Sequence, residues 1–154
     1  MHCVVAASTP RACAAYPLAC VLPTHCLSNS LTVHNMAHAP HQLGQAGEAA
    51  AADYYLARGY RVLVRGYRYR RAEVDLVLQL GTDLLVFTEV KTRSTGQFGT
   101  PETFVSDRKK QLFRLAATEL QEEMDWRGDI RFDIVALTVR SIGFHIEHFA
   151  DAFY

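Results

Sequence analysis

Acidic and basic side chains alternate along two neighbouring segments that could pair as strands, at a spacing that could build a catalytic centre. Successive side chains on a strand point to opposite faces. Glu73 and Asp75 therefore share one face of the first strand, and Glu89 and Lys91 share one face of the second. If residues 81–83 form the connecting turn, Asp75 lies opposite Glu89, and Glu73 lies opposite Lys91. Directly opposed Cβ atoms on paired strands are about 4.5–5.5 Å apart. The prediction depends on register, because a two-residue turn would move Asp75 to the other face.

Two carboxylates at this separation repel each other unless a positive group lies between them. Mg²⁺ suits the position because it takes oxygen ligands, often from one or two carboxylates, and keeps water and substrate phosphate in its other positions. Such an ion activates water and neutralises charge on a phosphodiester. Asp75, Glu89 and Lys91 therefore predict a metal-assisted hydrolase in which Lys91 positions the attacking water or stabilises the transition state. The alternative is structural: Glu73 and Lys91 form a cross-strand ion pair, and Asp75 and Glu89 face solvent.

The remaining pattern predicts the elements that must hold these residues. A helix is expected over residues 43–58, with Ala49, Ala52 and Leu56 on one face and Gly59 at its C-terminal end. A second helix is expected to begin at Ser106-Asp107 and to bury a stripe formed by Phe113, Ala116, Ala117, Leu120 and Met124. Strands are expected at 60–64, 72–80, 84–91, 130–139 and 144–148, and a loop at 92–103. The order α-β-β-β-α-β-β indicates an α/β fold, a mixed sheet flanked by helices.

The segments Ala72-Glu-Val-Asp75-Leu and Val86-Phe-Thr-Glu89-Val-Lys91-Thr-Arg resemble the core of the YraN family of predicted endonucleases. The resemblance covers about residues 42–154 in unbroken order. Its other elements are Gly44-Gln-Ala-Gly47-Glu48, Gly59-Tyr60, Phe98-Gly-Thr-Pro-Glu102, Lys109, Arg131-Phe-Asp-Ile-Val and Asp151-Ala-Phe. It implies a restriction-endonuclease-like fold of the PD-(D/E)xK nuclease superfamily.

The same resemblance implies a role for each site residue. Asp75 and Glu89 would be metal ligands, with the Val90 carbonyl as a third ligand, and Lys91 would be the catalytic lysine. Glu48 would be an additional acid near the metal, although by itself it could equally be an exposed residue stabilised by the helix dipole. One departure is Gly66, where many members have Asn.

A run of arginines without any acidic residue precedes the predicted site and indicates contact with nucleic acid. Arginines contact phosphates and tyrosines can stack on bases. The candidates for nucleic-acid binding are Arg65, Tyr67, Arg68, Tyr69, Arg70 and Arg71. Arg93 and Lys109 are further phosphate contacts, whereas the alternative for the whole run is a solvated strand face and loop. His145 and His148 are interpreted as structural or surface residues rather than metal ligands.

The first part of the chain differs from the rest in composition. Residues 1–47 contain all four cysteines and no acidic residue. The cysteine spacings suit neither a paired zinc site nor a disulfide framework for the rest of the chain. We expect residues 1–41 to be a disordered or non-native extension, with the natural start at Met36, and residues 42–154 to form the nuclease-like domain. That domain has no cysteine and suits the cytoplasm.

Composition narrows the class of protein further. The 154 residues carry 16 basic and 16 acidic side chains, so binding to nucleic acid must come from local clusters. The longest apolar-rich run is too short to span a bilayer, so no membrane association is expected. We expect an endonuclease that uses Mg²⁺ or Mn²⁺ on nucleic acid, with DNA, including branched DNA, favoured over RNA, and a homodimer if junctions are the substrate. The alternative is an inactive nucleic-acid-binding protein on the same fold. A glycoside hydrolase is disfavoured by the single tryptophan and the many arginines.

Overall fold

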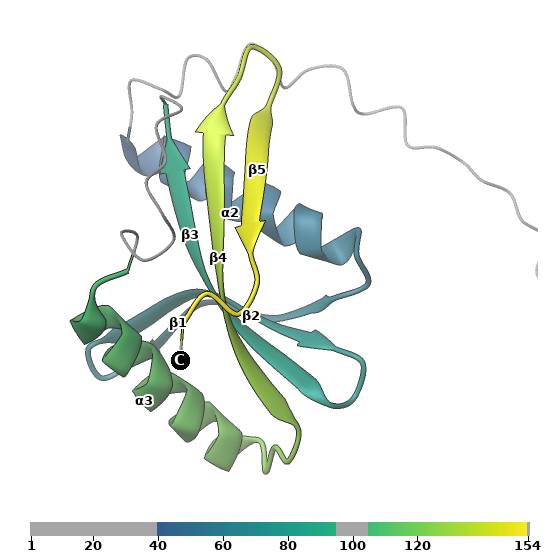
Figure 1. The fold of residues 1–154 in the computed structure, drawn as a ribbon, viewed down its shortest axis with the longest axis vertical. Coiled ribbons are helices and arrows are strands. Elements are labelled where there is room, and N and C mark those ends of the chain that lie inside the picture. The colour runs from purple at the N-terminus through teal and green to yellow at the C-terminus, as the bar shows by residue number, and fades with distance from the viewer. Residues whose placement is uncertain (1–39, 95–104, 154) are drawn as a thin grey trace, which may run out of the picture.

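A computed structural model describes residues 40–94 and 105–153 (Figure 1). The elements are α2 (Pro40–Leu56), β1 (Arg61–Tyr69), β2 (Ala72–Leu80), β3 (Leu84–Arg93), α3 (Asp107–Glu123), β4 (Asp129–Val139) and β5 (Phe144–Phe149). This order confirms the predicted α-β-β-β-α-β-β arrangement. The predictions for residues 1–39 and 95–103 lie outside the described residues. Two boundaries are corrected: Pro40 and His41, expected in the extension, begin α2, and Thr92 and Arg93, expected in the loop, end β3.

The strands form one mixed sheet of five strands in the order β1-β2-β3-β4-β5. All neighbours are antiparallel except β3 and β4, which run parallel and are connected through α3. A parallel pair needs such a crossover because a tight turn can join only antiparallel strands. The mixed sheet with flanking helices is the predicted fold class and is compatible with a restriction-endonuclease-like fold.

The two helices cover opposite faces of the sheet, and each face has its own hydrophobic cluster (Figure 1). On the α3 face, the predicted stripe is buried from Phe113 to Leu120, but Met124 is 41% exposed because it is the C-cap residue. Ser106 caps the start of α3 as predicted, and its hydroxyl accepts a hydrogen bond from the Lys109 backbone N–H. Full burial of Phe113 predicts a loss of about 3–5 kcal/mol on truncation to alanine.

The face shared by Ala49, Ala52 and Leu56 is not the one that α2 buries, although Ala52 itself is buried. Leu56 is 48% exposed, whereas the inward stripe of α2 consists of Leu43, Gly47, Ala51, Ala52 and Tyr55. Four consecutive alanines at 49–52 give little periodic contrast, so the sequence alone does not single out a face. Tyr55 identifies the true one, because its ring is fully buried and its hydroxyl donates to Asp133 at 3.0 Å. Within the described residues, no helix is long and apolar enough to cross a membrane.

Candidate active site

The β2–β3 hairpin has the predicted register up to the site and then opens. Its pairs run from Leu80–Leu84 to Leu76–Thr88. At the next position the Asp75 carboxylate accepts a hydrogen bond from the Val90 N–H, with Oδ2 2.6 Å from the nitrogen. Beyond this point β2 continues alongside β1, whereas β3 continues alongside β4. The Asp75 side chain therefore occupies the place where the two strands part, next to Glu89 and Val90.

This separation corrects one part of the sequence prediction. Glu73 does not lie opposite Lys91; it pairs with Arg68 on β1, and its carboxylate is 2.7 Å from the guanidinium. The turn length predicts which residues lie opposite each other only where the two strands are paired, and β2 and β3 are no longer paired at Glu73. The structural alternative also fails, because Glu89 is 1% exposed and Asp75 is half-buried, so they do not simply face solvent.

The buried Glu89 carboxylate is compensated by two lysines from different elements. Lys91 Nζ lies 2.5 Å from Oε1, and Lys109 Nζ from the first turn of α3 lies 2.5 Å from Oε2. Both lysine side chains remain about one-third exposed, whereas the Glu89 side chain is almost fully buried. Oε2 has no hydrogen bond of good geometry within the described residues, despite the nearby Lys109 ammonium. A buried charge requires such compensation because it has lost its hydration.

The Asp75 carboxyl group has a raised proton affinity. Its pKa rises from 3.8 to about 6, chiefly because it is buried and then because of the charge on Glu89, with Glu48 adding to the effect. The Val90 N–H and Lys109 act in the opposite direction. The contribution of Glu48 places this α2 residue within electrostatic range of the hairpin carboxylates.

Glycine at position 47 explains how α2 can come this close to β3. A Cβ atom added there would lie 1.8 Å from Thr92 Oγ1, so only the smallest residue fits at this crossing. Glu48 follows directly on the helix and is half-buried near the end of β3. Gly47 thus allows the close contact between α2 and Thr92, and Glu48, the next residue, is carried towards the hairpin carboxylates.

These groups suit a hard divalent cation. Asp75 and Glu89 offer carboxylate oxygens, Glu89 Oε2 lacks a hydrogen bond, and Val90 follows Glu89 on the same strand. Among the described residues, no group of three or more Asp, Glu, His or Cys side chains is close enough to hold a metal. A Mg²⁺ ion bound by one or two carboxylates, with water and substrate completing its shell, needs no third side chain.

Comparison with known proteins agrees with the resemblance seen in the sequence. The profile of Uncharacterised protein family UPF0102, also known as YraN, matches residues 47–137. The chain belongs to the UPF0102 family. A UPF0102 protein of Christiangramia forsetii is 40% identical over 113 residues, covering 73% of this chain and 94% of that protein. One of Chlorobium limicola is 39% identical over 126 residues, covering 77% of this chain and 97% of the relative.

At Gly66, where the resemblance implies asparagine in many relatives, the backbone is in the left-handed conformation. Gly66 has a φ of 62° and lies opposite Asp75, between the pairs Arg65–Leu76 and Tyr67–Val74. Glycine adopts this left-handed conformation freely, and asparagine tolerates it better than most residues. Glycine and asparagine can therefore both occupy this position. The left-handed residue lies where the hairpin opens around Asp75.

The structure separates the predicted nucleic-acid contacts of this UPF0102 chain into two groups. Tyr67 and Tyr69 are partly buried against the α3-side cluster, and the Glu119 carboxylate raises the pKa of Tyr69, first through a hydrogen bond. The arginines at 65, 68, 70 and 71 are exposed, as is Arg93 at the end of β3. Lys109 contacts Glu89, one of the two candidate metal ligands. Arg71 and Lys109 line the same hollow.

Two features of the structure have no clear signal in the sequence. Arg108 lines the same hollow as Arg71 and Lys109, but in the sequence it is only one of several bases near a helix start. Asp133 is fully buried and accepts from Tyr55 and Arg131, with His148 Nε2 at 2.8 Å from Oδ2. Burial favours the neutral acid, but these bonds outweigh it and lower the pKa of Asp133. The network holds α2 against β4 and β5 and gives His148 the structural role expected of it.

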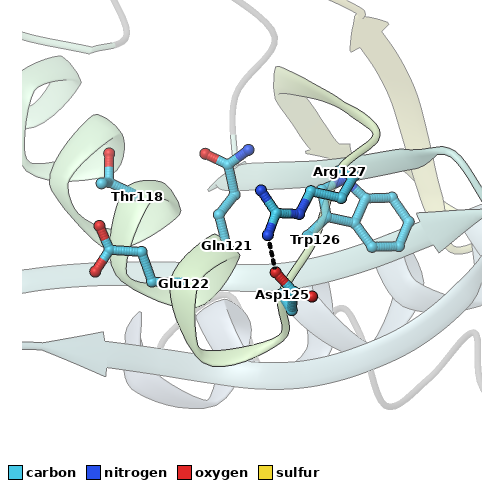
Figure 2. A pocket seen from close by; sticks show the side chains of 6 residues that line it. All are labelled: Thr118, Gln121, Glu122, Asp125, Trp126 and Arg127. Carbon is cyan, nitrogen blue, oxygen red and sulfur yellow. Dashed lines mark hydrogen bonds and ion pairs between the residues drawn. The ribbon is translucent and has the colours of Figure 1, made fainter.

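A separate hollow of about 390 Å³ lies at the far end of α3 (Figure 2). Its walls are formed by Thr118, Gln121, Glu122, Asp125, Trp126 and Arg127. Arg127 is ion-paired with Asp125, and the Trp126 indole donates to the Asp129 carbonyl at 3.2 Å. The α3 residues that line this hollow, from Thr118 to Glu122, lie about 14–20 Å along the helix from Lys109, so the hollow is not part of the carboxylate site.

Proposed function

We propose that this UPF0102 protein is a metal-dependent endonuclease that hydrolyses phosphodiester bonds in nucleic acid, with DNA favoured over RNA. The observation that carries the proposal is the convergence of Asp75 and Glu89 at the opening of the hairpin, with Lys91 and Lys109 on the buried Glu89 carboxylate. Binding alone would need no pair of partly desolvated carboxylates, which costs free energy to maintain. The arrangement has the acids and the lysine that hydrolysis of a phosphodiester requires.

Asp75 and Glu89 would hold a Mg²⁺ or Mn²⁺ ion, together with the Val90 carbonyl. When bound, the ion supplies positive charge that polarises the phosphate and makes a water molecule more acidic. Lys91 would donate hydrogen bonds to the attacking water or to a non-bridging phosphate oxygen, because its ammonium contacts the Glu89 carboxylate while its side chain stays about one-third exposed. Lys109 is placed to offset the charge of the phosphate group. Glu48 adds a negative charge that favours a cation at the same site.

The exposed arginines supply the attraction for a polyanion that the neutral chain otherwise lacks. Phosphate contacts hold a strand in position without reading its bases, so the proposal includes no sequence preference. Branched DNA is part of the proposal because related folds include junction resolvases. A junction-cutting enzyme needs two active sites, so a homodimer is predicted only if branched DNA is the substrate.

The test is Mn²⁺ titration by calorimetry together with cleavage of single-stranded, duplex and branched DNA and of RNA, using the full chain. The wild type is compared with Asp75→Asn/Glu89→Gln and with Asp53→Asn, which removes an exposed acid from α2. The proposal predicts metal-dependent cutting that the double variant loses and Asp53→Asn retains. Binding of nucleic acid that is unchanged by the double variant, with no cutting of any substrate, would instead identify a binding protein on a nuclease fold.

A further inference from the structure

A small hollow lined by basic side chains opens beside the candidate metal site. Its volume is about 260 Å³, and it is lined by Arg71, Glu73, Ser106, Arg108, Lys109 and Leu112. Lys109 also lies 2.5 Å from Glu89 Oε2, so one ammonium group borders both the hollow and the carboxylates. A group bound in the hollow would therefore be a near neighbour of a group bound at the metal site.

Within the described residues, the two arginines of the hollow lack acidic partners. Arg71 belongs to the turn between β1 and β2, and Arg108 to the first turn of α3. Both side chains are exposed, and neither has an ion-pair partner within the described part of the chain. The one acid in the lining, Glu73, is already paired with Arg68 at 2.7 Å. Residues far apart in sequence thus bring together uncompensated positive charge.

The chemistry of these groups matches a phosphate. The guanidinium of arginine presents several N–H donors in a fixed plane and binds phosphate oxygens in pairs. The side chains that line the hollow offer cationic donors for a phosphate but no aromatic ring on which a base could stack. The position next to the carboxylates suits a phosphate that belongs to the same strand as the one being hydrolysed.

We infer that this hollow is a phosphate-binding subsite, in which Arg71 and Arg108 hold a strand phosphate next to the scissile one. The inference rests on the proposed function for the meaning of "scissile", but binding of the phosphate does not require cleavage. Arg71 and Arg108 would position the strand and so decide which bond reaches Asp75 and Glu89. They would act as positioning residues.

Binding of a labelled single-stranded oligonucleotide in EDTA, over a range of salt concentrations, tests the subsite. Arg71→Ala/Arg108→Ala is compared with Arg114→Ala/Arg140→Ala, which removes two exposed charges outside the hollow. The subsite variant is expected to bind about tenfold more weakly, and its plot of log affinity against log salt should be shallower by about 0.7, the share of one single-strand phosphate. The control should change affinity by less than about twofold. Lysine at both positions should restore the slope, because lysine retains the charge.

Two further arms identify the phosphate and separate this inference from the proposed function. Equal affinity for linear and circular strands supports an internal phosphodiester, whereas a preference for a 5′-phosphorylated end that only the subsite variant loses supports a terminal phosphate. Equal affinity and slope for the subsite and control variants would overturn the inference, even if Mn²⁺-dependent cutting shows that the nuclease proposal is right. Loss of the phosphate contact without cutting by any form would keep the subsite and overturn the nuclease.

Discussion

Asp75→Asn should stabilise the metal-free protein at neutral pH while removing its function. The rise of the Asp75 pKa from 3.8 to about 6 means that the folded state disfavours the ionised carboxylate. At about 1.4 kcal/mol per pKa unit, ionisation of Asp75 costs the fold about 3 kcal/mol at pH 7. Asparagine has no charge to bury, and its side-chain carbonyl can still accept the hydrogen bond from the Val90 N–H. We therefore expect a gain of about 2–3 kcal/mol in the free energy of unfolding at pH 7.

The pH dependence gives this prediction its sign. A group whose pKa is higher in the folded state holds more protons there, so stability falls as pH rises through the interval between the two pKa values. For Asp75 that interval runs from 3.8 to about 6. The gap between variant and wild type should therefore be close to zero at pH 3.5, open up to about pH 6 and stay constant above pH 7.

Urea denaturation followed by circular dichroism, in EDTA at several pH values, measures the gap. Asp53→Asn is the matched control, because it removes an exposed carboxylate and should shift stability by less than about 0.5 kcal/mol. Adding Mn²⁺ should stabilise the wild type by about 2.7 kcal/mol at one hundred times its dissociation constant, and should not stabilise Asp75→Asn. The reasoning would be refuted if Asp75→Asn were less stable than the wild type at pH 7. It would also be refuted if the gain in stability were the same at pH 3.5 as at pH 7.

Three other variants test separate parts of the structure. Lys91→Met should lower single-turnover cleavage by about 10²-fold or more while Mn²⁺ uptake in calorimetry persists; an unchanged rate would remove Lys91 from the chemistry. Gly47→Ala should lower the free energy of unfolding in urea by about 1–3 kcal/mol, because its Cβ would meet Thr92 Oγ1 at 1.8 Å. Adding Thr92→Ala should restore part of this loss. If it restores none, the contact is not the cause. Gly66→Asn should melt within a few degrees of wild type. Gly66→Val should lose about 1–2 kcal/mol or more of unfolding free energy, because residue 66 has a φ of 62°. Equal melting temperatures for the two variants would show that position 66 does not need this conformation.

The sequence predicts the fold well where short-range rules decide it. The three residues after Leu80 set the register of the hairpin, so the approach of Asp75 to Glu89 follows from turn length and strand alternation. The start of α3 follows from Ser106, and its buried stripe from helical spacing up to Leu120. Each of these depends on neighbours within a few residues or on one turn.

Tertiary contacts decide the features that the sequence could not give. The opening of the hairpin removes Glu73 from Lys91, because beyond Leu76 the strand β2 remains paired with β1 and no longer with β3. The inward face of α2 is fixed by bonds of Tyr55 to residues 78 and 93 positions away, which no periodicity records. Arg108 becomes a candidate for phosphate binding only because the fold brings the β1–β2 turn, with Arg71, next to the start of α3.

The central claim is that Asp75 and Glu89 together support metal-dependent hydrolysis of nucleic acid. The most direct test is single-turnover cleavage of branched and single-stranded DNA in Mn²⁺ by the wild type and by Asp75→Asn/Glu89→Gln, with both proteins shown to be folded by circular dichroism. The account predicts cutting by the wild type that EDTA abolishes, and a loss of about 10³-fold or more in the double variant, because removing interactions made in the transition state costs several kcal/mol. Cutting at the same rate by a folded double variant would contradict it.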